Sequence, residues 1–171
     1  RHRCIHTLRI PILKLTSFGG AGTVTGSKHL LSHNGKHILV DCGLFQGLKN
    51  LRELNWQRLP VNAGDIDAVV LTQDWHPHDH TSFAANHPGA APFSQVQMPY
   101  GPQVLWPAHC VIGTPGAGFH PGLATDVADL VIRKGFRPGI DSYSAFFEND
   151  HRTPTGLAGY LRDRGLSDLT F

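Results

Sequence analysis

A short apolar run followed closely by a carboxylate and three histidines is the feature that most constrains this chain. The run Ala68-Val69-Val70-Leu71-Thr72 has the length and the β-branched content of a buried strand, and Asp74, His76, His78 and His80 follow it. In α/β folds, side chains at the C-terminal ends of parallel strands carry the chemistry. The sequence therefore predicts a functional site at the end of this strand.

The residue types at that strand end are ligands of divalent metal ions such as Zn²⁺ and Fe²⁺. Asp74 and His76 stand two residues apart, His80 follows, and His109 comes from a separate loop. One divalent ion at these four side chains is the favoured interpretation. A surface cluster in a chain with 12 histidines is the alternative. A second ion, bound by His76, His78 and His80, is a further alternative.

Hydrophobic patterning predicts an α/β fold. Asn34-Gly35 between two apolar runs is typical of a β-hairpin. Apolar residues at helical spacing, such as those between Leu48 and Leu59, predict helices, and the segment from 73 to about 124 is expected to be rich in loops. The predicted strands span 5–17 (broken at Pro11), 28–32, 36–40, 66–72, 129–134 and 166–171, and the predicted helices span 48–59 and 154–164. We expect a mixed, largely parallel sheet with an N-terminal antiparallel hairpin, in a three-layer-like arrangement.

Composition excludes several classes of protein. A length of 171 residues predicts one domain, and a net charge of +2 gives no reason to expect nucleic acid or a membrane surface as a partner. The three cysteines form no CxxC pair, which favours a reducing cytoplasm over a disulfide framework. The apolar stretch near the start is interrupted by Pro11 and Lys14, so neither a signal peptide nor a membrane span is expected there.

The first part of the chain resembles the N-terminal part of the β-CASP group of metallo-β-lactamase-fold nucleases. The similar text lies within residues 13–72 and includes Ser17-Phe18-Gly19-Gly20-Ala21-Gly22 and Asp41-Cys42-Gly43-Leu44-Phe45-Gln46-Gly47. In that family the last strand is followed by His-x-His-x-Asp-His, which binds two zinc ions. Here Gln73-Asp74-Trp75-His76 stands in its place.

The remainder, from about residue 69 to 171, resembles the central part of a nicotinamidase of the isochorismatase-like hydrolase fold. The similar motifs are Thr72-Gln73-Asp74-Trp75-His76-Pro77, Trp106-Pro107-Ala108-His109-Cys110, Ile132-Arg133-Lys134-Gly135 and Asp141-Ser142-Tyr143-Ser144. The two resemblances meet inside residues 69–72. They imply a single hybrid domain over 1–171, with a 1–72 segment and a 69–171 segment, that is truncated relative to both parent folds.

The nicotinamidase resemblance implies roles for particular residues. Asp74, His76 and His109 would bind one metal ion, Zn or Fe, with His80 as a further ligand or close neighbour. The ion would hold a small pyridine-type ligand. Lys134 stands where the family's catalytic lysine lies, and a solvated lysine after a strand is the alternative. Asp41 ends a strand comparable to the one that carries the family's catalytic aspartate, and a loop-ordering carboxylate, as in the nuclease segment, is the favoured alternative. In the family, the cysteine nucleophile lies in the turn after the strand that follows the 154–164 helix. This sequence ends at Phe171, before that turn, so we expect none of its cysteines to take that position.

These observations predict a metal-binding, nicotinamidase-like hybrid with little or no amidase activity. A hydrolase whose metal activates water on a phosphodiester or ester, and a recombined or engineered scaffold without function, are the alternatives. An uncovered sheet edge near Leu166 predicts a homo-oligomer.

Overall fold

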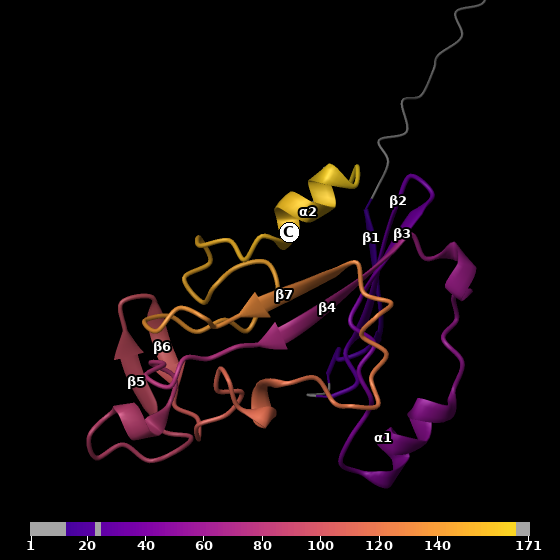
Figure 1. Cartoon of the computed structure of the whole chain (residues 1–171). Coiled ribbons are helices and arrows are strands. Elements are labelled where there is room, and N and C mark those ends of the chain that lie inside the picture. The colour runs from indigo at the N-terminus through magenta and orange to yellow at the C-terminus, as the bar shows by residue number, and fades with distance from the viewer. Residues whose placement is uncertain (1–12, 23–24, 167–171) are drawn as a thin grey trace, which may run out of the picture. The chain divides into compact units, whose positions relative to one another are not determined.

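The chain divides into two compact units, and the division falls between Ala68 and Val69. The computed structural model describes residues 13–22 and 25–166 (Figure 1). The first unit comprises the residues up to Ala68 together with the last residues from Leu166, and the second comprises Val69–Gly165. None of the helices in the described part of the chain has the length and apolar character needed to cross a membrane.

An antiparallel three-stranded arrangement forms the first unit. Strands β1 (Lys14–Gly19), β2 (Lys28–His33) and β3 (Lys36–Val40) pair in sequence order. The β2–β3 turn places Asn34 at φ 50° and Gly35 at φ 76°, the left-handed backbone that Asn-Gly adopts in two-residue hairpin turns. The predicted hairpin is therefore confirmed.

The helix predicted over 48–59 is shorter than expected. Helix α1 spans Lys49–Glu53, and the 3-10 turn η1 covers Leu54–Trp56. No side chain caps the N-terminus of α1, and the amide of Asn55 bonds to both backbone groups of Phe45, at 2.8 and 2.9 Å. A polar side chain that serves a neighbouring loop competes with helix propagation, which explains the early end. A further 3-10 turn, η2, spans Ala63–Asp65.

A parallel strand pair organises the second unit. Strand β4 (Ala68–Asp74) pairs in parallel with β7 (Leu130–Lys134), and the two lie side by side in Figure 1. Val70 and Ile132 are buried. Helix α2 spans Leu157–Asp163, shorter than the predicted 154–164.

The segment between β4 and β7 contains a hairpin that the sequence pattern did not predict. Strands β5 (Gln95–Met98) and β6 (Gly101–Val104) form a hairpin, and the 3-10 turns η3 (Ala84–Asn86) and η4 (Pro115–Ala117) flank it. Each strand has four residues and few buried side chains, so hydrophobic alternation gave no signal.

The prediction of an α/β fold with a mixed sheet and an N-terminal hairpin is confirmed. The strand predicted over 66–72 begins and ends two residues later, so Asp74 is its last residue. The strand predicted over 129–134 is β7. The predictions for residues 5–12 and 167–171 lie outside the described residues.

Candidate metal centre

Three buried side chains of the second unit offer ligand atoms that all lie within 4.8 Å of one another: His76, His80 and Asp141. Their exposed fractions are 2%, 0% and 2%. Two imidazoles and one carboxylate form a donor set that binds Zn²⁺ and Fe²⁺ in proteins. We refer to these three residues as the metal cluster.

His76 is held with one ring nitrogen directed at a backbone carbonyl. Its Nδ1 lies 2.9 Å from the oxygen of Gly135. Since a carbonyl only accepts, Nδ1 carries the proton, and Nε2 of the neutral ring keeps a lone pair that can bind a metal ion. A Cβ on Gly135 would lie 2.4 Å from Cε1 of His76, and Gly135 has φ 61°. Only glycine therefore permits this approach of backbone to ring.

Both ring nitrogens of His80 have a hydrogen-bond partner. Nδ1 lies 2.7 Å from the hydroxyl of Ser82, and Nε2 lies 3.2 Å from the carbonyl oxygen of Ile140. Burial, reinforced by the neighbouring His76, lowers the pKa of His80 below its ordinary value. The ring is therefore neutral near pH 7, and a neutral ring is the form of histidine that binds a metal ion.

Asp141 was not predicted as a ligand, although it stands in one of the motifs similar to nicotinamidases. Its Oδ1 accepts from the backbone N–H of Ser142 at 2.9 Å, and its Oδ2 accepts from Nε2 of Gln103 at 2.9 Å. Gln103 is itself buried and also donates to the carbonyl of Val104. These bonds fix the carboxylate, and each oxygen retains a lone pair.

Of the four predicted ligands, the structure brings His76 and His80 together and places His109 beside them. The rings of His109 and His76 have centroids 4.8 Å apart. Nδ1 of His109 donates to the carbonyl of Pro107 at 2.8 Å, so Nε2 keeps a lone pair that can bind a metal ion. The buried ring of Phe83 packs against all three imidazoles, with centroid distances of 5.6, 5.6 and 5.5 Å.

Asp74 is not a member of the metal cluster. Its Oδ1 accepts from Nζ of Lys134 at 2.5 Å, and the two residues pair in register at the ends of β4 and β7. Both charges of this ion pair act on the Cys110 thiol. Burial and the Asp74 carboxylate raise the pKa of the thiol, and the Lys134 ammonium lowers it by a smaller amount. Asp74 and Lys134 thus form an ion pair outside the metal cluster.

The remaining predicted positions are not members of the metal cluster. His78 is exposed, although it alternates with the buried His76 and His80 in the sequence. Its backbone carbonyl accepts a hydrogen bond from the Asn86 side chain. Asp41 belongs to the first unit, where it follows β3 at φ 59°. The roles assigned to Asp41 and Lys134 stay predictions.

Comparison with known proteins finds nicotinamidases over the larger part of the chain, while no family model matches it. The nicotinamidase of Acinetobacter baylyi is 63% identical over 104 residues, 61% of this chain and 49% of the relative. The structure of a nicotinamidase/pyrazinamidase of Acinetobacter baumanii shares 62% identity at a TM-score of 0.58, covering 61% of this chain and 50% of that one. The yeast nicotinamidase bound to the inhibitor nicotinaldehyde shares 31% identity at a TM-score of 0.54, with 60% and 52% covered.

A smaller share of the chain is similar to a different protein. A ribonuclease of Thermus thermophilus is 42% identical over 69 residues, which make up 40% of this chain and 15% of the relative. The chain spans about half the length of the curated nicotinamidases it matches. Over about 60% of its length, it is similar in sequence and in fold to nicotinamidases.

Proposed function

We propose that this protein binds one divalent metal ion and a small pyridine-type ligand in its nicotinamidase-like unit, with little or no amidase activity. The observation that carries the proposal is the metal cluster, in which two imidazoles and one carboxylate lie within 4.8 Å of one another. Two imidazoles and one carboxylate are donor types of zinc and iron sites in proteins. Their close approach in the second unit supports a coordinating role.

The donor set fits zinc or iron better than magnesium or calcium, because those harder ions prefer oxygen ligands. Gly135 orients the His76 ring through a hydrogen bond, and Gln103 orients the Asp141 carboxylate in the same way. Metal ligands in proteins are usually oriented by such further hydrogen bonds. Nε2 of His109 is available as a further donor in this proposal. When bound, the ion supplies a Lewis acid that polarises a ligand atom.

A pyridine-type ligand is proposed from the relatives. The yeast nicotinamidase structure holds nicotinaldehyde, and that protein is 31% identical to this chain over the covered part. A pyridine nitrogen is chemically close to an imidazole nitrogen and suits the same metal ions. The Phe83 ring, which packs against the three imidazoles, adds an aromatic wall beside the ion.

Weak or absent amidase activity is proposed from the surroundings of one residue, Lys134. Lys134, the residue that corresponds to the family's catalytic lysine, is bonded to Asp74 instead of being free to assist a thiol. An attacking thiolate needs a lowered pKa or an adjacent base. The similarity to nicotinamidases covers about half of the length of those relatives and supports ligand binding.

The hybrid origin of the chain is part of the proposal. Nicotinamidases match 61% of the chain and a ribonuclease matches 40%, and the compact units divide between Ala68 and Val69. This division lies next to the stretch 69–72 in which the two resemblances meet. Both facts support a recombined chain, natural or engineered. The ribonuclease similarity is also the observation that favours the second candidate function, a hydrolase in which the ion activates water.

The experiment that tests the proposal combines metal analysis with two assays. We expect about one equivalent of zinc or iron per purified chain, perturbation of a cobalt-substituted spectrum by nicotinamide, and hydrolysis of nicotinamide near background. Metal-dependent cleavage of a phosphodiester would favour the second candidate. A chain without bound metal, even after incubation with excess zinc, would contradict both.

A further inference from the structure

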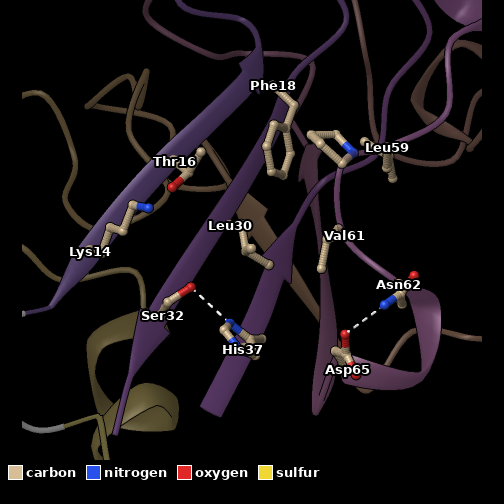
Figure 2. A pocket seen from close by; sticks show the side chains of 11 residues that line it. Lys14, Thr16, Phe18, Leu30, Ser32, His37, Leu59, Val61, Asn62 and Asp65 are labelled. Carbon is tan, nitrogen blue, oxygen red and sulfur yellow. Dashed lines mark hydrogen bonds between the residues drawn. The ribbon is translucent and has the colours of Figure 1, made fainter. Parts of the chain in front are cut away.

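A hollow of about 530 Å³ lies in the first unit, among residues that the proposed metal site does not involve. Three strands, β1 to β3, and the segment 59–65 line it (Figure 2). Sites for small organic molecules typically have volumes of about 300–1,000 Å³. The hollow therefore has the size of a ligand site.

Polar side chains form one row across the strands at the floor of this hollow. Lys14 of β1 pairs with Ser32 of β2, which in turn pairs with His37 of β3. The Ser32 hydroxyl lies 2.8 Å from Nδ1 of His37. When Nδ1 donates to Oγ, the hydroxyl hydrogen is free to bond to a bound ligand. The row thus offers an ammonium and a hydroxyl to the same space.

Apolar side chains form the wall next to that row. Leu30 is two residues from Ser32 on β2, so both side chains face the hollow, and Phe18 follows from β1. Leu59 and Val61 lie on the opposite side, beyond Phe18 and Leu30, in Figure 2. Apolar side chains therefore line the part of the hollow that lies away from Lys14.

The charges around the hollow favour a monoanion. Within the part of the chain that the structure describes, Lys14 makes no ion pair or side-chain hydrogen bond. Asp65 lies across from it, with Ser32 and His37 between them in Figure 2, and accepts from the Asn62 amide at 3.1 Å. The Asp65 carboxylate repels a dianion such as phosphate more strongly than a monoanion, because the repulsion grows with the charge of the ligand.

We propose that this hollow binds a small aromatic carboxylate. The carboxylate of the ligand meets the Lys14 ammonium and the Ser32 hydroxyl, while its ring packs between Phe18, Leu30 and Val61. A carboxylate bonded to an ammonium and a hydroxyl forms charge-assisted hydrogen bonds, and ring burial adds the hydrophobic contribution.

Amide NMR spectra of the isotope-labelled full chain, titrated with sodium benzoate, test the proposal. We expect saturable shifts confined to β1, β2, β3 and 59–65. Acetate lacks the ring and benzyl alcohol lacks the charge, so each should bind at least about tenfold more weakly. Lys14→Met should weaken benzoate binding about tenfold, and Val61→Trp, which fills the hollow, should abolish it.

Lys36→Met is the matched control, since Lys36 precedes His37 on β3 and alternation directs it to the opposite face. Equal benzoate affinity in Lys14→Met and Lys36→Met, acetate binding as tight as benzoate binding, or no saturable shift would overturn the proposal. The spectrum of each variant reports whether it is folded. If Val61→Trp unfolds, Lys14→Met still tests the proposal, because Lys14 is exposed and its substitution should leave the fold intact. A His76→Ala variant should keep benzoate binding, which separates this site from the metal centre.

Discussion

The ammonium of Lys134 lies 2.5 Å from the carboxylate of Asp74, where β7 and β4 end in register. The lysine side chain is 14% exposed and the aspartate side chain is 39% exposed. Nicotinamidase resemblance assigns one of these residues to the activation of a thiol and the other to the metal. In this chain the two form an ion pair with each other, and neither is a member of the metal cluster.

Replacing Lys134 with methionine should lower the free energy of unfolding by about 1–3 kcal/mol, because the partly buried Asp74 carboxylate loses its partner. Asp74→Asn combined with Lys134→Met should cost less than the sum of the two single changes. Urea unfolding measures all three. Lys49→Met is the control, because its partner Glu53 is exposed and such pairs contribute only about 0.3–0.5 kcal/mol. Additive costs would show that Asp74 and Lys134 are not coupled.

Two sets of metal ligands can be separated by substitution. The structure groups Asp141 with His76 and His80, whereas the resemblance groups Asp74 with His76 and His109. Asp141→Asn should lower metal content and affinity at least about tenfold, as losing one ligand does. Asp74→Asn should leave metal content near that of the unchanged protein. Plasma mass spectrometry of each purified variant gives the content, and competition with a chelator gives the affinity.

His78→Ala is the control for this series, since His78 is exposed in the same loop as His76 and His80. His76→Ala belongs to both ligand sets and should remove most of the metal. Metal retained in Asp141→Asn and lost in Asp74→Asn would favour the ligand set of the resemblance over the metal cluster.

Nicotinamide hydrolysis should stay near background in the metal-loaded protein, and Cys110→Ser should not change it. The reason is that burial and the Asp74 carboxylate raise the pKa of the Cys110 thiol, so little thiolate is present near pH 7. Release of ammonia measures the reaction. Turnover at an ordinary enzymatic rate that iodoacetamide abolishes and Cys110→Ser removes would identify Cys110 as a nucleophile and contradict the proposed lack of activity.

Local patterns predicted the fold where their signals are strong. Asn34-Gly35 favours a left-handed turn, and the short apolar, β-branched runs of β4 and β7 favour strands, although only Ile132 of β7 is buried. The β5–β6 hairpin was not predicted because its strands are short and polar, with Pro102 inside β6. Helix α1 stopped early because the Asn55 side chain serves Phe45, an interaction between residues ten apart that periodicity does not encode.

The candidate site was predicted in part for the same reason. His76 and His80 follow a strand and lie close in sequence, so spacing alone grouped them. Asp141 lies 65 residues after His76 and joins it only through the fold. Its one signal in the sequence was its membership of a motif similar to nicotinamidases. The pairing of Asp74 with Lys134 depends on the parallel register of β4 and β7, which no local pattern specifies.

A turn in the second unit provides a prediction on pH. The Asp150 carboxylate accepts from the Thr153 hydroxyl at 2.6 Å and from the Thr153 and Arg152 N–H groups at 2.8 and 2.9 Å. These bonds, the hydroxyl first, lower the pKa of Asp150 from 3.8 to about 2. Because the folded pKa lies below the unfolded one, the stabilisation is complete above the unfolded pKa of 3.8 and is lost as the pH falls through about 2.

Thr153→Val removes the hydroxyl donor and should raise the pKa of Asp150 toward its ordinary value. Its destabilisation relative to the unchanged protein should therefore be largest above pH 3.8 and should shrink as the pH falls through about 2. Carboxyl carbon NMR gives the pKa, and urea unfolding across this range gives the stability. Thr125→Val, an exposed change elsewhere in the same unit, should leave both unaltered. A stability difference that does not vary with pH would show that the Thr153 hydroxyl acts through packing and not through the charge of Asp150.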